Sequence, residues 1–205
     1  MTTATETTSM GLLLAGDRTP IDLSILQGLW TDAQYLRLTN QTNRLLEFTD
    51  GVIEVLPMPT DKHQTILEFL FLALREFMLP RGGKVLFAPL RLQIRLDKFR
   101  EPDILLILTA DDPRRQNSFW LGADLVVEIV SPDDPERDTV EKVADYAEAG
   151  IPEYWIVNPL EETITVLQLA GEQYAELGVF GRGAQAHSAL LAGFEIAVDV
   201  VLDAR

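Results

Sequence analysis

Two carboxylates occupy unusual places in the sequence. Asp103 opens the apolar run Ile104–Leu108, and Glu128 interrupts a second run, Leu125–Val130. Each run predicts a buried strand, where an unpaired carboxylate is costly, so a metal ion or a cation is needed to neutralise it. Lys142 follows on the next predicted helix. Two strand carboxylates with a nearby lysine are the minimum set of groups for metal-assisted phosphodiester chemistry.

The chemistry depends on how these groups meet. On adjacent strands, the carboxylates of Asp103 and Glu128 would converge at one sheet edge and bind Mg²⁺ or Mn²⁺ through oxygen. Such a metal polarises a phosphate and lowers the pKa of its bound water. Lys142 shares a helical stripe with Asp138 and Tyr146, and its ammonium would orient the attacking water and stabilise phosphate charge. The alternatives are two solvent-facing carboxylates and a surface ion pair between Asp138 and Lys142.

Other polar residues lie on a predicted helix over 61–78 and in the loop between the two acidic strands. Glu68 stands in an almost wholly apolar helical stretch, so it either finds a cation, a metal or a water channel, or lies on one exposed stripe. His63, in the first helical turn, would transfer a proton or bind an anion, unless it only caps or packs. Arg114, Arg115 and Trp120 would contact a nucleic-acid backbone or base, although a polar loop is the default interpretation.

Apolar periodicity, caps and turn residues predict the elements that position these groups. Helices are expected over 32–38, 61–78 and 135–149, the last with the core face Val140, Val143, Ala144 and Ala147. Strands are expected over 45–48, 52–56, 84–87, 90–96, 103–108, 125–130, 153–157, 164–169 and 173–179. The segment from 125 to 157 predicts a right-handed crossover, and the class is α/β or α+β with a mixed sheet.

Composition narrows the organisation of the chain. Its 205 residues predict one domain over 21–205 after a Thr-rich, poorly ordered segment over 1–20. No apolar stretch reaches the roughly 18 residues that span a bilayer. The absence of cysteine fits a cytoplasmic protein, and two histidines disfavour a multi-histidine zinc site. The apolar run Ala189–Phe194 exceeds what one sheet edge needs, which favours a symmetric homodimer.

The net charge of −15 argues against broad electrostatic attraction to nucleic acid. A divalent cation in an acidic site would offset part of this charge locally. The charge also suits a protein that meets DNA only through a protein partner.

Several motifs together resemble the Uma2 family of bacterial proteins, long called a domain of unknown function. They are Pro102-Asp103, Glu128-Ile129-Val130-Ser131-Pro132, the stripe Asp138, Lys142 and Tyr146, the run Gly150–Val157, and the N-terminal pattern of Glu47-Phe48, Asp50-Gly51 and His63. The resemblance covers roughly residues 30 to 200. It implies a restriction-endonuclease-like core of the PD-(D/E)XK superfamily, with a mixed sheet flanked by helices.

The resemblance also implies roles. Asp103 and Glu128 match the two acidic positions of the superfamily, and Glu68 matches the acidic residue of the first core helix. The superfamily lysine would fall at Val130, so Lys142 is its migrated replacement. The implied metal ligands are Asp103, Glu128 and Glu68, and these with Lys142 form the implied catalytic set. The implied substrate-contacting or supporting residues are His63, Ser131, Asp138 and Tyr146.

These expectations lead to one main function and two alternatives. The main prediction is a Mg²⁺- or Mn²⁺-dependent endonuclease that hydrolyses DNA phosphodiester bonds. A catalytically inactive nuclease-fold protein that binds a partner is favoured by the acidic charge and the displaced lysine. A hydrolase of a small phosphorylated or nucleotide substrate needs no basic surface.

Overall fold

The computed structural model describes residues 11–13 and 20–205, and the chain divides into two compact units. The smaller unit ends at Met58 and includes Leu96–Phe99, and the larger contains Pro59–Arg95 and Arg100–Arg205. Most of the segment 1–20, expected to be poorly ordered, lies outside the described residues. A single domain over 21–205 stays a prediction.

The smaller unit is built around a helix and a hairpin. Helix α1 (Asp32–Thr39) begins at the predicted cap Thr31, which forms a capping box with Gln34. The remaining elements are β1 (Gly11–Leu13), β2 (Pro20–Asp22), a 3₁₀ turn η1 (Ser24–Leu26), β3 (Leu46–Thr49), β4 (Val52–Val55), and the first two residues of β7 (Lys98–Arg100), which pair with β3.

Two local features fix the hairpin. Asp50 and Gly51 join β3 to β4 with φ angles of 47° and 83°, as the Asp-Gly signal predicts for a tight turn. The ring of Tyr35 on α1 stacks on Phe48 with centroids 5.2 Å apart, and its hydroxyl donates to the carbonyl of Leu46 at 2.7 Å. Glu47, which strand alternation would place on the surface, is buried.

The larger unit contains a six-stranded mixed sheet in the order β12-β11-β10-β9-β8-β5. Strands β9 and β10 are parallel, and the other neighbours are antiparallel. The sheet strands are β5 (Lys84–Phe87), β8 (Ile104–Ile107), β9 (Leu125–Ile129), β10 (Glu153–Asn158), β11 (Thr163–Ala170) and β12 (Gln173–Gly181). The other elements are α2 (Asp61–Met78), the 3₁₀ turn η2 (Leu79–Arg81), β6 (Leu92–Arg95), the π-helical turn η3 (Arg137–Glu141), α3 (Lys142–Glu148), β13 (Gln185–His187), β14 (Glu195–Ala197) and α4 (Val198–Leu202).

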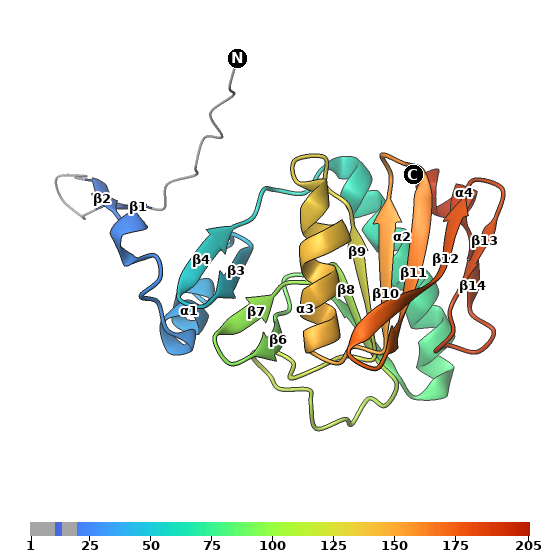
Figure 1. The fold of residues 1–205 in the computed structure, drawn as a ribbon, viewed down its shortest axis with the longest axis horizontal. Coiled ribbons are helices and arrows are strands. Elements are labelled where there is room, and N and C mark those ends of the chain that lie inside the picture. The colour runs from blue at the N-terminus through green and yellow to red at the C-terminus, as the bar shows by residue number, and fades with distance from the viewer. Residues whose placement is uncertain (1–10, 14–19) are drawn as a thin grey trace, which may run out of the picture. The chain divides into compact units, whose positions relative to one another are not determined.

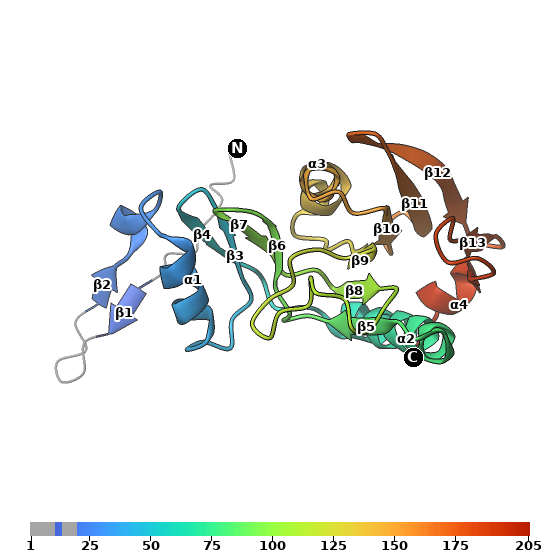
Figure 2. The same ribbon diagram turned by 90° about the horizontal axis from the view of Figure 1, so that it is seen from below.

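Helices α2 and α3 cover opposite faces of this sheet (Figures 1 and 2). Alternation along β9 sorts its side chains between the two faces. Leu125 and Val127 join the cluster that contains the buried side of α2, and Val126 joins the cluster that contains Tyr146 of α3. Glu128, two residues after Val126, therefore faces α3.

The predicted core face of the third helix is wrong in part, because Val143 packs against the cluster that contains Tyr146 but two of the other predicted positions face solvent. Val140 is 62% exposed and Ala144 is also exposed. The buried side chains of this helical segment are Asp138, Lys142, Asp145 and Tyr146. Burial here follows ion pairs and hydrogen bonds with the rest of the unit, so the polar stripe faces inward. The segment also contains a π turn, in which the amide of Lys142 donates to the carbonyl of Arg137, where a regular helix was expected.

The C-terminal apolar run packs inside its own chain. Leu191 and Phe194 belong to the same buried cluster as Trp155, together with Val198 of α4. The apolar side chains over 189–194 that were expected to exceed the needs of the sheet edge are therefore largely buried within the unit. The homodimer stays a prediction, without this support.

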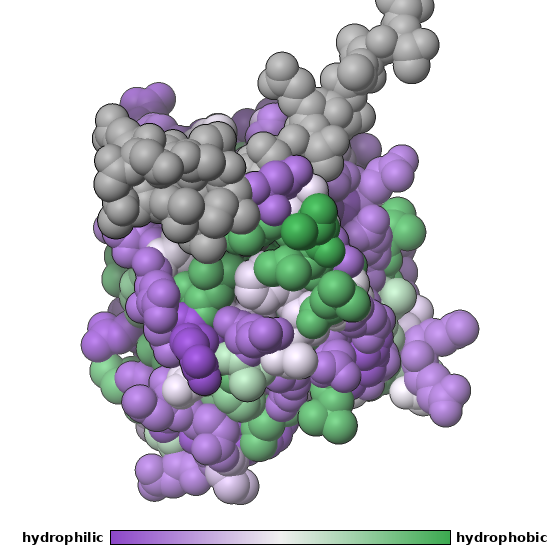
Figure 3. Space-filling model, turned by 90° about the vertical axis from the view of Figure 1, so that its left-hand side faces the viewer, coloured by the Kyte–Doolittle hydropathy of each residue, from purple (hydrophilic) through white to green (hydrophobic). Residues whose placement is uncertain are grey.

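The chain has a net charge of −15. Figure 3 shows one face of the molecule, where apolar side chains form small groups among polar ones. Across the described part of the chain, no helix has the length and apolar character needed to cross a membrane.

Candidate functional site

Asp103 lies directly before β8 and links three elements. Its Oδ2 accepts a hydrogen bond from the amide of Ile129 at 2.7 Å and lies 3.1 Å from Nε2 of His63. His63 is in the first turn of α2, where its own amide donates to the capping hydroxyl of Thr60 at 3.2 Å. Asp103 and His63 each keep 14% of their side-chain surface exposed, so they form the open side of the site.

Glu128 forms the buried side and is 2% exposed. Its Oε1 accepts hydrogen bonds from the ammonium of Lys142 at 2.9 Å and from the hydroxyl of Tyr146. Its Oε2 lies 3.4 Å from the amide of Asp103. The structure thus brings Asp103, Glu128 and Lys142 into one cluster at the end of the sheet where β8 begins and β9 ends.

Lys142 is shared between two carboxylates. Its Nζ is 2.9 Å from Oε1 of Glu128 and 2.9 Å from Oδ1 of Asp138, and all three side chains are almost fully buried. The π turn that precedes Lys142 is held to the sheet by Tyr154, whose hydroxyl donates to the carbonyl of Asp138 at 2.8 Å. This turn is a local wide turn of the kind often found at functional sites, and hydropathy does not reveal it.

The charges in the cluster perturb its protonation. Burial raises the pKa of Glu128 to about 8; the ammonium of Lys142 opposes this rise, and the charges of Asp103 and Asp138 add to it. Burial alone would lower the pKa of His63, but its hydrogen bond to Asp103 and the charges of Asp103 and Asp138 outweigh burial and raise it. The site therefore contains groups whose proton occupancy changes near neutral pH.

Two predicted site residues do not join the cluster. Glu68 is exposed on α2, and no hydrogen bond or ion pair connects it to another residue of the described chain. The buried positions of α2 recur every three or four residues, which leaves Glu68 and the half-exposed Leu72 on a solvent stripe. Ser131 is half-buried, two residues beyond the end of β9. Their roles, like those of the other site residues, stay predictions.

Sequence reasoning missed a buried ion pair that supports α3. Nη2 and Nε of Arg100 lie 2.6 Å and 2.7 Å from the same oxygen of Asp145. Both side chains are buried. Asp145 lies one residue before Tyr146, so this pair helps to hold the helical face that presents Tyr146 and Lys142 to Glu128. The signal in the sequence was the position of Asp145 directly before Tyr146. A carboxylate next to a buried aromatic residue indicates that a cation lies close to it.

The carboxylates can be tested as ligands for a hard cation. Asp103 uses only Oδ2 in its two hydrogen bonds, and Oε2 of Glu128 has only the long contact with the amide of Asp103. Over the described ranges, no group of three or more His, Cys, Asp or Glu side chains is arranged to hold a metal ion. Mg²⁺ commonly takes one or two carboxylates and fills its other positions with water and substrate phosphate. The pair Asp103 and Glu128 fits that smaller donor set, whereas the expected third carboxylate, Glu68, does not contribute to it.

Comparison with known proteins gives the same type of fold. The Uma2 family model, described as "Putative restriction endonuclease", matches residues 32–199. No curated protein matches the chain. Among solved structures, a "putative nuclease belonging to DUF820" from Anabaena variabilis has a TM-score of 0.66 and 21% sequence identity, over 82% of this chain and 96% of that chain. At this identity the likeness concerns the fold, and the expected mixed α+β architecture is confirmed.

Proposed function

This chain belongs to the Uma2 family, and from that premise we propose that it is a metal-dependent endonuclease that hydrolyses phosphodiester bonds in DNA. Family membership and the fold of the similar nuclease support a nuclease-like function in general. The observation that carries the finer proposal is the contact of Lys142 with the carboxylate of Glu128. The same carboxylate lies 3.4 Å from the backbone amide of Asp103. These contacts gather two carboxylates and an ammonium in one place.

Asp103 and Glu128 would hold Mg²⁺ or Mn²⁺ through their less engaged oxygens. When bound, such an ion polarises phosphate oxygen and supplies a nucleophilic hydroxide at neutral pH. Because burial raises the pKa of Glu128 to about 8, the cation competes with a proton at this carboxylate, and binding releases that proton.

The remaining residues act on water and phosphate. Lys142 orients the attacking water and stabilises charge that develops on the phosphate, and Asp138 keeps its ammonium beside Glu128. Tyr146 fixes the carboxylate of Glu128 by hydrogen bonding. His63, whose Nδ1 is buried without a hydrogen-bond partner in the described structure, is placed next to Asp103 for proton transfer.

Two alternatives keep an observation in their favour. The net charge of −15 favours a small phosphorylated or nucleotide substrate, or DNA delivered by a protein partner. An inactive interaction protein was suggested by Val130 at the position of the superfamily lysine. The 2.9 Å contact of Lys142 with Glu128 weakens this second alternative, since the ammonium is supplied from α3 instead.

Cleavage assays test the proposal. Supercoiled and linear DNA, a single-stranded oligonucleotide and a small phosphodiester are incubated with Mg²⁺ or Mn²⁺. Cleavage should require the metal and should fall at least about 100-fold in Asp103→Asn and Lys142→Ala, a loss typical of transition-state groups. Glu68→Gln changes an exposed glutamate on α2 and is the matched control, expected to remain active. Equal turnover in the wild type and Lys142→Ala would contradict the proposed mechanism.

A further inference from the structure

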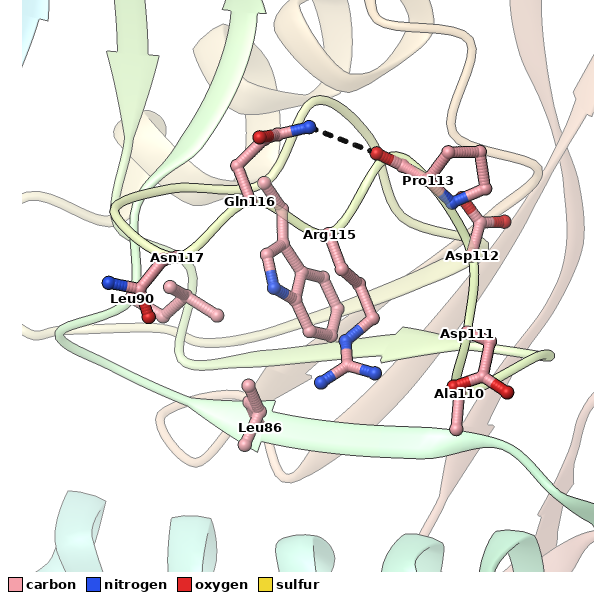
Figure 4. Close-up of a pocket in the computed structure, with 10 residues that line it drawn as sticks. Leu86, Leu90, Ala110, Asp111, Asp112, Pro113, Arg115, Gln116 and Asn117 are labelled. Carbon is pink, nitrogen blue, oxygen red and sulfur yellow. Dashed lines mark hydrogen bonds between the residues drawn. The ribbon is translucent and has the colours of Figure 1, made fainter.

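A pocket lies on the same sheet face as Glu128. It has a volume of about 570 Å³, within the roughly 300–1,000 Å³ typical of small-molecule sites. Leu86 of β5, Leu90 and the loop 110–120 between β8 and β9 form its walls (Figure 4).

Strand register gives the distance between the pocket and the acidic cluster. Leu86 pairs with Leu105, and Leu105 pairs with Val126, two residues before Glu128. All three belong to or pack against the buried cluster on the α3 side of the sheet. Two strand spacings and two residues along β9 place the Cα atoms of Leu86 and Glu128 roughly 12 Å apart. At its Leu86 wall, the pocket therefore lies roughly 12 Å from Glu128 on the same sheet face.

Arg115 provides the main polar group of the pocket. Figure 4 shows its guanidinium directed toward the centre, with Leu86 on one side and Asp111 on the other. Its Nε is buried and has no hydrogen-bond partner among the residues that the structure describes. A desolvated donor without an acceptor is unfavourable, so this atom points to an acceptor on a ligand.

The loop uses its two adjacent arginines differently. Arg114 forms ion pairs of 2.8 Å with Asp112 and 2.8 Å with Asp124 and so braces the loop. Arg115 instead lies over the indole of Trp120, with 5.7 Å between its guanidinium carbon and the ring centroid. Trp120 is 2% exposed, so its ring packs under the guanidinium in a fixed position. Arg115 is thus held in place and remains available for a ligand.

The charges around Arg115 select the type of ligand. Asp112 is neutralised by Arg114, but Asp111 is exposed at the same pocket and would repel a phosphate group. A ligand that satisfies both side chains has acceptors for Arg115, donors for Asp111, and a flat apolar body for Leu86 and Leu90. Guanine has this combination, because its O6 and N7 accept bidentate hydrogen bonds from arginine while its amino edge donates.

We propose that this pocket binds a guanine base, with Arg115 donating to O6 and N7 and Asp111 accepting from the opposite edge. The inference rests on the proposed function, because a base held here brings its own phosphodiester toward Asp103 and Glu128. It narrows the substrate class to a guanine nucleotide or to a strand with an unstacked guanine beside the cleaved bond. Recognition of a base in a pocket also needs no basic surface, which agrees with a net charge of −15.

Binding is measured without metal, by calorimetry and by tryptophan fluorescence. The probes are dGMP, dAMP, dCMP, TMP and inorganic phosphate. The dGMP should bind saturably, and Arg115→Gln should weaken it at least about tenfold, the loss expected for one bidentate contact. Asp111→Asn should also weaken dGMP. Arg75→Gln, which changes an exposed arginine of α2, is the control and should bind as the wild type does.

Several results would overturn the proposal. They are absence of dGMP binding at millimolar concentration, equal affinity for all four nucleotides, competition by phosphate alone, or equal dGMP affinity in the wild type and Arg115→Gln. Unfolding curves of Arg115→Gln establish that a loss of binding is not a loss of fold. Within a positive result, an oligonucleotide with one guanine, compared with one that has none, distinguishes a base in a strand from a free nucleotide.

The same variants separate this proposal from the nuclease. Glu128→Gln should bind dGMP as the wild type does while it loses cleavage. Cleavage without dGMP binding would contradict the guanine pocket alone, and dGMP binding without any cleavage would contradict the nuclease alone.

Discussion

Two buried glutamates on neighbouring strands have opposite surroundings. Glu153, in β10, is 0% exposed and accepts hydrogen bonds from the indole of Trp155, the hydroxyl of Ser188 and the amides of Ala189 and Leu190. Glu128, in β9, is equally buried, but its partners are an ammonium and a phenol.

This difference distinguishes a carboxylate held by neutral donors from the one to which we assign a role in the proposed chemistry. The donors around Glu153 are neutral, and three of them lie in the loop between β13 and β14. The hydrogen bonds of its carboxylate therefore hold the C-terminal segment on the sheet. Glu128 instead contacts the charged ammonium of Lys142, which is shared with Asp138. Burial alone therefore does not distinguish these two carboxylates; their hydrogen-bonding and ion-pair partners do.

The largest expected effect on stability is at Glu153. Glu153→Ala leaves buried donors at Trp155, Ser188 and two amides unsatisfied, and should lower the free energy of unfolding by about 3 kcal/mol or more. Chemical denaturation measures this loss. Glu195→Ala, at an exposed position of β14, is the control and should change stability little. Similar free energies of unfolding for the two variants would contradict the structural role assigned to Glu153.

The next effect concerns metal at Glu128. At a concentration of Mg²⁺ or Mn²⁺ about 100-fold above Kd, the wild type should gain about 2.7 kcal/mol of stability by mass action. Glu128→Gln should abolish this gain, and its metal-free stability should equal or exceed that of the wild type, because a charge repelled by Asp103 and Asp138 is removed. Thermal melts with and without metal test both points. Identical metal-induced shifts in the two proteins would exclude the acidic pair as the metal site.

Per pH unit, a smaller effect is expected from the pH dependence of stability. Glu128 has a pKa of about 8 in the fold against an ordinary value of 4.5, so the folded state holds more protons than the unfolded state between these values. Stability must then fall as pH rises through this window, by at most about 1.4 kcal/mol per pH unit for one proton. Denaturation from pH 5 to 9 should show a shallower fall in Glu128→Gln than in the wild type. Parallel curves would mean that Glu128 does not cause the pH dependence.

The smallest effect is at His63. Its raised pKa contributes stability that is complete below its ordinary pKa of 6.5 and is lost as pH rises through the raised value. Asp103→Asn removes the charge that raises this pKa and should move it downward. NMR titration of the imidazole resonances measures the shift, with His187 as an internal reference. An unchanged titration of His63 would show that the 3.1 Å contact with Asp103 does not control its protonation.

Local signals in the sequence predicted much of the fold. Thr31 and Thr60 mark the starts of α1 and α2, and Asp50-Gly51 marks the hairpin turn, because caps and tight turns are decided by neighbouring residues. The short strand β7 was missed. Its Lys-Phe-Arg sequence has little apolar alternation, and pairing with β3 gives it its structure.

Part of the candidate site was predictable where charge interrupts an apolar run. Asp103 and Glu128 were found in this way. The polar stripe of Asp138, Lys142 and Tyr146 was expected to approach these carboxylates, but its deep burial was not, because Val140 and Ala144 have the apolar spacing of a core face. For Glu68 the sequence left two places open, and the structure has the exposed stripe, because a long apolar run conceals which side of a helix faces solvent.

The π turn before α3 makes segment length, rather than residue identity, the sensitive property of residues 137–141. An α-helix turns by about 100° per residue, so deletion of one residue between Asp138 and Lys142 would turn these two side chains relative to each other by roughly that angle, even if every remaining side chain were kept. Exchange of the exposed Val140 for another helix former leaves that phase intact. We therefore expect a change of length in this stretch to disturb the cluster more than an exchange of one of its exposed residues.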